Sequence, residues 1–374
     1  MLREADVDGK RKPLSILAEL TYRCNLSCPY CYNPLDLQAY RTELTLPQWE
    51  RVIGEAADLG VLQAHFSGGE PTLRADDLIS LVRAARGREL YTNLITQGTF
   101  LSDALIARLE AAGLDHVQLS LQAARGPLAD SIAGAKVHGK KLDALRRVAK
   151  SGMAVTLNCV LHRANIDDVD ALIAIAEAAG VRRVELANVQ FYGWAMLNRG
   201  ALMPTREQVE RAGASVAAAR RRLAGAIEID HVLADYYERF PKPCMDGWGR
   251  TFMTVAPDGR VFPCPAAPAI AGMRFENVLE RPLDKIWYES APFEAYRGVG
   301  WMPEPCRSCE RREVDWGGCR CQAFLLTGDA GRTDPACSLS PDHALVEAAV
   351  AGPAPASAGS GDGEWTPRRM KTTR

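Results

Sequence analysis

The sequence contains neither a long apolar segment nor an excess of one charge. No run of its 374 residues approaches the roughly 20 consecutive apolar residues that cross a bilayer. The formal net charge is -1, which gives no electrostatic attraction to nucleic acid or to an anionic membrane. The first twelve residues are charged and precede no apolar stretch of signal-peptide length. We therefore expect a cytoplasmic protein without nucleic-acid or membrane partners.

Several common catalytic signatures are also missing. The sequence has no P-loop, no Gly-x-Gly-x-x-Gly after an apolar strand and no arguable Ser/His/Asp set, and its six histidines do not cluster. Cysteine, in contrast, is plentiful: ten of the eleven cysteines lie either before residue 32 or after residue 243. Because a reducing compartment keeps thiols free, cysteines in a cytoplasmic protein indicate metal binding more than disulfides. The clustering predicts two metal-bearing parts.

The first part is the run Cys24, Cys28 and Cys31, a Cys-x3-Cys-x2-Cys spacing in a polar, proline-broken loop after the apolar stretch Leu14 to Leu20. Thiolates spaced in this way hold iron-sulfur clusters. A four-iron cubane with three local cysteines keeps one iron open, and an open iron can bind a substrate. A structural zinc site is the alternative, but zinc sites usually show two Cys-x2-Cys pairs or added histidines. The spacing favours the cluster.

Short apolar runs alternate with amphipathic stretches of helical period from Leu14 to about Asp230, which is typical of β/α units around a parallel sheet. Strands are predicted over residues 15–20, 62–66, 90–96, 117–121, 154–161 and 183–189. Six units are too few for a closed eight-fold barrel, so we expect an α/β fold built on a partial, TIM-like (β/α)6 barrel. The predicted divisions are an extension (1–12), a barrel core (13–230), a loop-rich domain (231–345) and a disordered tail (346–374).

A glycine motif follows the second predicted strand, as Ser67-Gly68-Gly69-Glu70-Pro71. Paired glycines let the backbone approach a ligand closely and expose carbonyl groups, and the Glu70 carboxylate could accept a hydrogen bond from a ligand ammonium. Alone, the motif indicates no more than a turn. Its position at the carboxyl end of a strand, where ligands bind in βα architectures, favours a binding role.

This glycine motif lies one β/α unit after the cysteine loop, and in that place it resembles the SAM-binding motif of the radical S-adenosyl-L-methionine (SAM) superfamily. Tyr30, in the cysteine loop, stands where the superfamily has an aromatic residue. The resemblance implies a [4Fe-4S] cluster on the three cysteines, with SAM on its open iron. Ser120, ending the fourth predicted strand, and Asn158, on the polar face of the fifth, are candidate SAM contacts; Lys136 is a weaker one. Each could equally be an ordinary hydrogen-bonding residue. Cys159 falls on the apolar face of its strand and is expected to be a buried structural thiol.

The second part is an aromatic- and proline-rich stretch with seven cysteines: Cys244, Cys264, Cys306, Cys309, Cys319, Cys321 and Cys337. Its spacing resembles the SPASM extension of radical SAM enzymes, which carries two auxiliary iron-sulfur clusters, and Asp315 stands where that pattern has a cysteine. Two clusters held fully by protein need eight ligands, so Asp315 is the expected eighth. The alternative is that Asp315 only caps the turn before Trp316.

Six segments carry a closer resemblance, over residues 19–24, 28–34, 66–74, 94–98, 185–190 and 317–322. Through them, the chain from Pro13 to about His343 is similar to the family that cyclises the precursor peptide PqqA in pyrroloquinoline quinone biosynthesis. The resemblance assigns one set of ligands to an auxiliary [2Fe-2S] cluster and another to a [4Fe-4S] cluster. The first set is Cys244, Cys264, Cys319 and Cys321, and the second is Cys306, Cys309, Asp315 and Cys337.

The same resemblance implies the chemistry and the partners. A radical formed from SAM is expected to remove a hydrogen from a Glu side chain of PqqA, and the carbon radical to bond to a Tyr ring. A small peptide chaperone, PqqD, and an electron donor such as flavodoxin are the implied partners. The nearest alternative is another SPASM peptide modifier, such as a sulfatase-maturing or thioether-forming enzyme. A non-catalytic metal-binding protein is a more distant one.

Overall fold

One sheet of nine strands organises the molecule. The structure is a computed structural model that describes residues 10–40, 42–352 and 365–368. The strands follow the spatial order β7-β6-β5-β4-β3-β2-β1-β8-β9. Their bounds are β1 Ser15–Glu19, β2 Gln63–Ser67, β3 Tyr91–Thr96, β4 His116–Ser120, β5 Ala154–Leu161, β6 Arg183–Asn188, β7 Glu228–Val232, β8 Phe252–Val255 and β9 Val261–Phe262.

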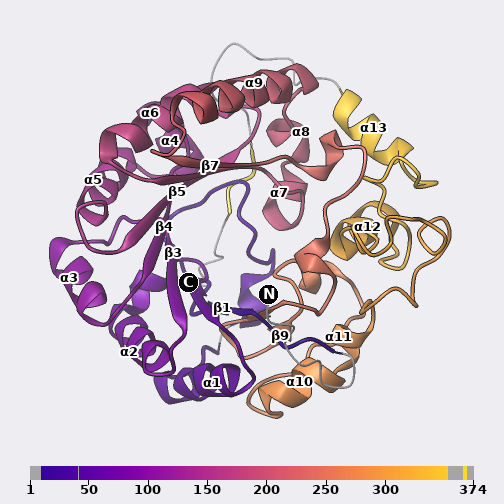
Figure 1. Cartoon of the computed structure of the whole chain (residues 1–374), viewed down its shortest axis with the longest axis horizontal. Coiled ribbons are helices and arrows are strands. Elements are labelled where there is room, and N and C mark those ends of the chain that lie inside the picture. Colours follow the sequence, from indigo (N-terminus) through magenta and orange to yellow (C-terminus); the bar gives the residue numbers. More distant parts are fainter. Residues whose placement is uncertain (1–9, 41, 353–364, 369–374) are drawn as a thin grey trace.

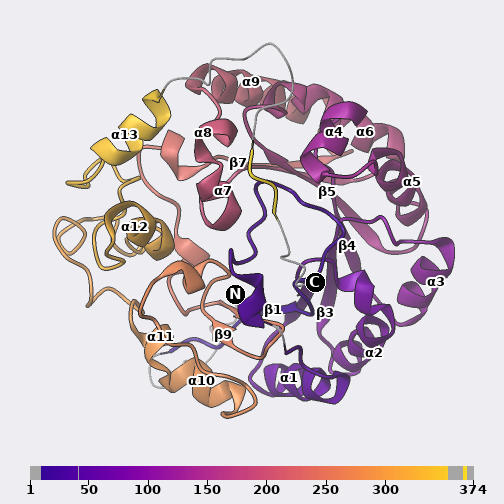
Figure 2. The same cartoon turned by 180° about the vertical axis from the view of Figure 1, so that it is seen from behind.

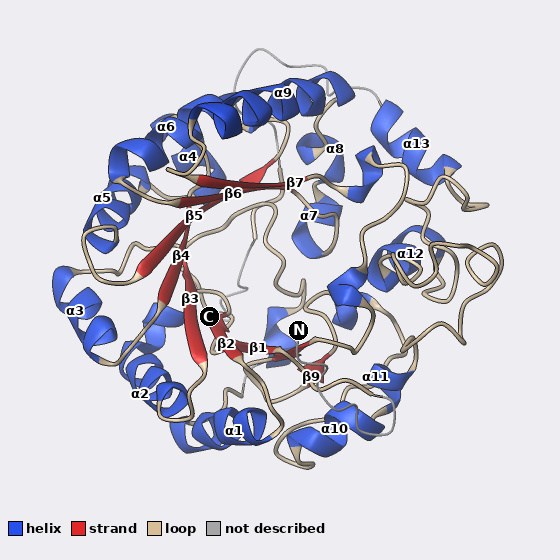
Figure 3. Cartoon of the chain, viewed as in Figure 1, coloured by secondary structure: helices blue, strands red, loops and turns tan. Residues whose placement is uncertain are grey.

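The sheet confirms the expected fold class and is wider than the sequence predicted. All neighbouring pairs are parallel except β8 and β9, which are antiparallel. The six predicted strands are present as β1 to β6. β7 continues the parallel series, and β8, from the second cysteine region, pairs with β1 so that Ser15 lies opposite Phe252. Among the described strands β7 and β9 form the two edges, so the barrel is partial, as Figure 3 shows.

Helices surround this sheet on its outer side. In Figures 1 and 2, α1 to α6 and α9 form a ring outside the strands, and α10 to α13 lie across the open side. The helices are α1 Leu46–Asp58, α2 Ala75–Arg86, α3 Asp103–Ala111, α4 Gly126–Ala133, α5 His138–Val148, α6 Val169–Ala179, α7 Gly193–Leu197, α8 Arg199–Leu202, α9 Arg206–Arg222, α10 Leu283–Glu289, α11 Ala291–Glu294, α12 Arg320–Thr327 and α13 Ala344–Ala351.

Local sequence explains where the longer helices begin and end. α9 starts with a capping box of two hydrogen bonds. The Gln208 backbone N–H donates to the Thr205 hydroxyl (3.2 Å), and the Thr205 backbone N–H donates to the Gln208 side-chain oxygen (3.0 Å). α6 ends at Gly180, whose φ of 73° is left-handed and therefore suits glycine. Short connections between such helices and the strands leave the loops at the carboxyl ends of the strands free to form a site.

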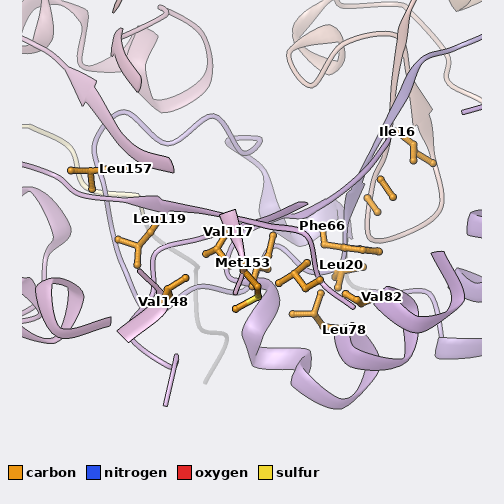
Figure 4. Packing of buried hydrophobic residues seen from close by; sticks show 14 of the residues in the cluster. Ile16, Leu20, Phe66, Leu78, Val82, Val117, Leu119, Val148, Met153 and Leu157 are labelled. Atoms are coloured by element: carbon orange, nitrogen blue, oxygen red, sulfur yellow. The ribbon is translucent and has the colours of Figure 1, made fainter. Parts of the chain in front are cut away.

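The core lies between the sheet and this outer ring of helices. Phe66 and Leu157 on the strands pack with Leu78 and Val82 of α2 and Val148 of α5 in one buried cluster, part of which Figure 4 shows. Full burial of each such side chain stabilises the fold by about 1.5–3 kcal/mol relative to exposure. Cys159 is 0 % exposed within the same cluster, so it is a core thiol as expected. The barrel wall thus needs no metal to hold its shape.

The second cysteine region has much less regular structure. Between β9 and α12, the described chain forms only short helices and turns (Figure 3). The predicted domain bounds at residues 12, 230 and 345 stay predictions, because β8 joins the later region to the barrel sheet.

The expected disordered tail differs from what the structure describes. Residues 344–351 form α13, and Trp365 to Arg368 pack against the barrel. Residues 353–364 and 369–374, and most of the predicted extension over residues 1–12, lie outside the described residues. Within the described part of the chain, no helix is both long and apolar enough to span a bilayer.

Candidate active site and cysteine sites

The first three cysteines lie on a loop that leaves the carboxyl end of β1. The loop is held by a hydrogen bond from the Ser27 N–H to the Ala133 carbonyl (2.8 Å), at the end of α4. Burial raises the pKa of the Cys24 thiol to about 11 and that of Cys28 to about 12. Thiols in such a place become thiolates when a metal compensates their charge. The cysteine loop therefore suits a cluster better than free thiols.

The glycine motif packs directly onto the cysteine loop. The Gly69 N–H donates to the Thr21 carbonyl (2.5 Å), and the Glu70 N–H donates to the Arg23 carbonyl (2.8 Å). A Cβ on Gly68 would lie 2.2 Å from the Thr21 carbonyl oxygen, and one on Gly69 would lie 2.3 Å from that of Arg23. Only glycine permits this approach, so the motif positions the loop after β2 against the loop after β1.

The Glu70 carboxylate accepts hydrogen bonds from its own chain. Its carboxylate is completely buried, and Oε1 accepts from the Thr72 N–H (3.0 Å) and the Thr96 hydroxyl (2.8 Å). Oε2 accepts from the Gln97 N–H (2.9 Å), and Glu70 is not among the residues that line the cavity described next. The side chain thus ties the glycine loop to the end of β3, and its contact with a ligand ammonium stays a prediction.

A cavity of about 340 Å³ lies at the carboxyl ends of the strands. It brings together most of the predicted site: Cys24, Cys28, Cys31, Tyr30, Gly68, Gly69, Ser120 and Asn158. Tyr30 packs beside His162, with ring centroids 5.5 Å apart. These residues come from the loops after β1 and β2 and from β4 and β5, which are far apart in the sequence. The sheet topology alone makes them neighbours.

A buried lysine, Lys141, lies near the Cys28 thiol of the cysteine loop. Neither Lys141 nor Lys136 lines the cavity, and Lys136 is exposed. Lys141, on α5, is 0 % exposed, and its ammonium has no hydrogen-bond partner among the described residues. Burial lowers the pKa of Lys141 to about 8, and the nearby thiol of Cys28 opposes that shift. A buried cation without a partner is costly, so this position suits an anionic ligand next to the cysteine loop.

A second set of cysteines converges outside the barrel. Hydrogen bonds join the Cys244 thiol to those of Cys264 and Cys319, and join Cys321 to the same two. The hydrogen bonds from Cys244 and Cys321 hold the pKa of Cys264 well below its usual value. Cys264 follows β9, whereas Cys319 and Cys321 begin α12. The four residues that the family resemblance groups for one auxiliary cluster therefore do meet.

The remaining ligand candidates also meet, in a small pocket lined by Cys306, Cys309, Asp315 and Cys337. Asp315 Oδ1 accepts from the Gly317 N–H (3.1 Å), and Oδ2 accepts from Arg311 Nε (3.3 Å). Both interpretations of Asp315 are therefore compatible with the geometry: it caps the turn before the paired glycines, and it lies among three cysteines. Its role as an iron ligand stays a prediction.

The donor chemistry of these sets fits iron-sulfur clusters. Each set presents three or four soft thiols at one place, and Asp315 adds a carboxylate to one of them. Within the described ranges, no three His, Cys, Asp or Glu side chains are arranged for a single metal ion. A cluster of several metal atoms holds its thiolates farther apart than one ion does. The Lys141 ammonium, which is buried without a hydrogen-bond partner among the described residues, further indicates that a charged group binds beside the cysteine loop.

Comparisons with known proteins agree with this arrangement. Residues 18–176 match the Radical SAM superfamily, and residues 244–310 match an iron-sulfur cluster-binding domain, SPASM. The chain is 52% identical over 339 residues to a PqqA peptide cyclase of Granulibacter bethesdensis, covering 90% of each chain. It is 54% identical over 348 residues to one of Streptomyces rochei, covering 92% of this chain and 95% of the relative. The chain belongs to the PqqA peptide cyclase family. It is thus a radical SAM enzyme with a SPASM iron-sulfur domain.

Solved structures share the fold at low identity. SuiB of Streptococcus suis, bound to S-adenosylmethionine, gives a TM-score of 0.72 at 19% identity, over 87% of this chain and 77% of that one. The enzyme anSMEcpe, with bound AdoMet and a peptide, gives 0.63 at 17% identity, over 90% and 95%. These similarities confirm the partial barrel with its C-terminal extension. The matches also support SAM and iron-sulfur clusters as cofactors of this family member.

Three residues of the site were not found from the sequence. Lys141 sits in an ordinary amphipathic helix, and Tyr192, which lines the cavity, precedes a short helix. Arg368 lies in the segment expected to be disordered, yet it also lines the cavity. A lysine or arginine carries no local signal of burial, because only the packing of distant elements decides whether its charge is enclosed.

Proposed function

We propose that this enzyme forms a carbon-carbon bond between a Glu and a Tyr side chain of PqqA, an early step of pyrroloquinoline quinone biosynthesis. The names of the relatives support PqqA as the substrate. The observation that carries the proposal is the single cavity that contains the cysteine loop, the glycine motif and the polar ends of β4 and β5. That cavity is where a radical could be generated next to an enclosed peptide side chain.

Each part of the cavity has a task in this chemistry. Cys24, Cys28 and Cys31 would hold a [4Fe-4S] cluster, and the backbone of Gly68 and Gly69 would face SAM. When bound, these groups supply a carbon-centred radical that can remove an unactivated hydrogen, and the auxiliary clusters supply electron acceptors. Ser120, Asn158 and the Lys141 ammonium would orient the polar groups of SAM.

The protein's own contribution is enclosure and position. The cavity lies inside the ring of strands and helices, and exclusion of water protects a reactive carbon radical from other hydrogen donors. Tyr192 forms part of its wall and packs against the buried cluster that contains Cys264 and Cys321. Electrons released when the Tyr ring of the substrate regains aromaticity therefore have a short path toward the four-cysteine set.

Further parts of the proposal rest on the family resemblance. The set of Cys244, Cys264, Cys319 and Cys321 is assigned a [2Fe-2S] cluster, and the set with Asp315 a [4Fe-4S] cluster. PqqD would present the peptide, a flavodoxin-type protein would supply electrons, and the reaction would take place in the cytoplasm. The convergence of each set supports two separate auxiliary sites.

The test is mass spectrometry of PqqA after anaerobic incubation with the reconstituted enzyme, PqqD, SAM and a strong reductant. A new carbon-carbon bond removes one hydrogen from each partner, so we expect a peptide lighter by two hydrogens, with fragments that map to a Glu-Tyr link. Formation of 5′-deoxyadenosine with unchanged peptide would contradict the substrate and favour another SPASM peptide modifier. No deoxyadenosine from protein with full iron content would contradict the whole mechanism.

A further inference from the structure

A short segment near the C-terminus lies against the cysteine loop. The Thr366 N–H donates to Asn198 Oδ1 (2.7 Å), and Asn198 Nδ2 donates to the Thr366 carbonyl (2.8 Å). The same Nδ2 donates to the Pro29 carbonyl (2.9 Å), inside the cysteine run. Trp365 packs edge-on against His162 at 6.1 Å, and Figure 2 shows the segment, in yellow, inside the ring of helices. These contacts anchor residues 365–368 at the wall of the cavity.

The last described residue, Arg368, reaches into the cavity itself. Its backbone N–H donates to the Ser27 carbonyl (3.1 Å), and its guanidinium donates to the Tyr22 carbonyl. It also donates to Asn33 Oδ1 (3.4 Å), the same oxygen that accepts from the Cys31 thiol (3.5 Å), and its charge opposes the rise that burial causes in the pKa of that thiol. The side chain is 3 % exposed and lines the same cavity as the three cysteines.

The charge of Arg368 is not balanced by a carboxylate. The hydrogen-bond acceptors of its guanidinium among the described residues are two neutral oxygens, and Nε has no partner there. A guanidinium keeps its charge in any environment, and burying it without an anion is costly. The three cysteines Cys24, Cys28 and Cys31 interact electrostatically with Arg368 and can become negative. The missing anion is therefore the thiolate-held cluster itself.

We propose that Arg368 is a positioning residue for the SAM cluster, donating an N–H to the sulfur of Cys31, and that residues 365–368 enclose the cluster on this side. The inference rests on the proposed function only in assigning a cluster to these cysteines. A cluster becomes more negative when reduced, so a fixed neighbouring cation stabilises the reduced state more than the oxidised one. Hydrogen bonds to cluster sulfurs and solvent exclusion act on the reduction potential and on cluster retention.

The experiment compares Arg368→Met, Arg368→Lys and wild type as full-length, anaerobically reconstituted proteins. One readout is the midpoint potential of this cluster, followed by electron paramagnetic resonance. The signal of this cluster is recognised because it changes when SAM is added. The other is the rate of iron loss from that cluster to a chelator. We expect Arg368→Met to have a more negative midpoint and about tenfold faster iron loss. Arg368→Lys should recover the midpoint in part, because it keeps the charge.

Two further variants separate local from general effects. Arg182→Met removes the same charge from an exposed position before β6, at the other end of the barrel, and should match wild type. Trp365→Ala, which loosens the anchor but keeps Arg368, should shift both readouts in the direction of Arg368→Met.

An Arg368→Met protein with full iron content and wild-type midpoint and iron loss would overturn the proposal. So would weaker SAM binding at an unchanged midpoint, because Arg368 would then serve SAM rather than the cluster. Neither readout uses PqqA, so a failure of peptide cross-linking alongside the expected shifts would count against the proposed substrate alone.

Discussion

The cysteine loop after β1 and the four-cysteine set outside the barrel differ in what holds them. The first leaves a strand of a nine-stranded sheet and is fastened by backbone hydrogen bonds to the glycine motif and to α4. The second brings together Cys244 in a short 3-10 turn, Cys264 shortly after β9, and the two cysteines at the start of α12. The barrel site thus has its shape before a metal binds, whereas the second site is itself a link between loops. We therefore expect loss of metal to abolish activity at the barrel site and to impair folding at the four-cysteine set.

The sharpest test of the first half of this comparison is Cys28→Ser. A weaker ligand at this buried position should abolish SAM cleavage while leaving thermal unfolding close to wild type, because the sheet and its helices hold the loop. Chromatographic detection of 5′-deoxyadenosine and a melting curve measure both. Cys159→Ala is the matched control: its thiol is part of the apolar core and is not one of the three cysteines of the loop, so cleavage should persist. A large fall in melting temperature for Cys28→Ser would break the comparison.

The corresponding test of the second half is Cys321→Ser. Cys321 is 0 % exposed and hydrogen-bonded to Cys264 and Cys319, so loss of its metal bond should release auxiliary iron and lower the free energy of unfolding by about 3 kcal/mol. Chemical denaturation and an iron count measure the change. Cys306→Ser, at a partly exposed site, should destabilise the protein less. Equal effects of the two variants would contradict a structural role specific to the four-cysteine set.

A smaller effect is expected beside the cysteine loop from Lys141→Met. Removing the buried ammonium should weaken SAM binding about tenfold, corresponding to roughly 1.4 kcal/mol, because an anionic group of SAM loses its charged partner. Equilibrium dialysis with labelled SAM under anaerobic conditions gives the affinity. Lys136→Met removes the same charge from an exposed neighbour and should bind SAM as wild type does. If Lys136→Met were the weaker binder, the interpretation of the cavity would be wrong.

The smallest change is expected from Asp315→Ala. A carboxylate binds iron less firmly than a thiolate, so its loss should lower iron content modestly or alter the auxiliary-cluster spectrum, with SAM cleavage retained. Mössbauer spectroscopy and an iron count provide the readout. Asp315→Cys should restore iron content, since it supplies the ligand that the wider pattern has at this position. An unchanged spectrum and iron count in Asp315→Ala would contradict the ligand role. Asp315 would then serve only through its hydrogen bonds with Arg311 and Gly317.

Much of the fold and the cysteine chemistry follows from local patterns. Alternating apolar runs predicted β1 to β6, and cysteine spacing indicated the candidate ligands that the structure then brings together. β8 could not be found in this way, because a four-residue strand pairs with β1 only through a contact that spans most of the chain. Glu70 was assigned to a ligand because its motif stands at a strand end. Its four hydrogen-bond donors, from residues 72, 96 and 97, became visible only in three dimensions.

The sequence by itself determined the family, the candidate metal ligands and the parallel sheet, since cysteine spacing and hydrophobic period are local properties of the chain. The tertiary structure alone decided which charges are buried. Lys141 and Arg368 resemble any surface cation in the sequence, and Lys136 seemed the more natural choice, yet only the first two are enclosed beside the cysteine loop. Burial depends on the packing of elements from distant parts of the chain, and it is burial that makes an unpaired charge significant.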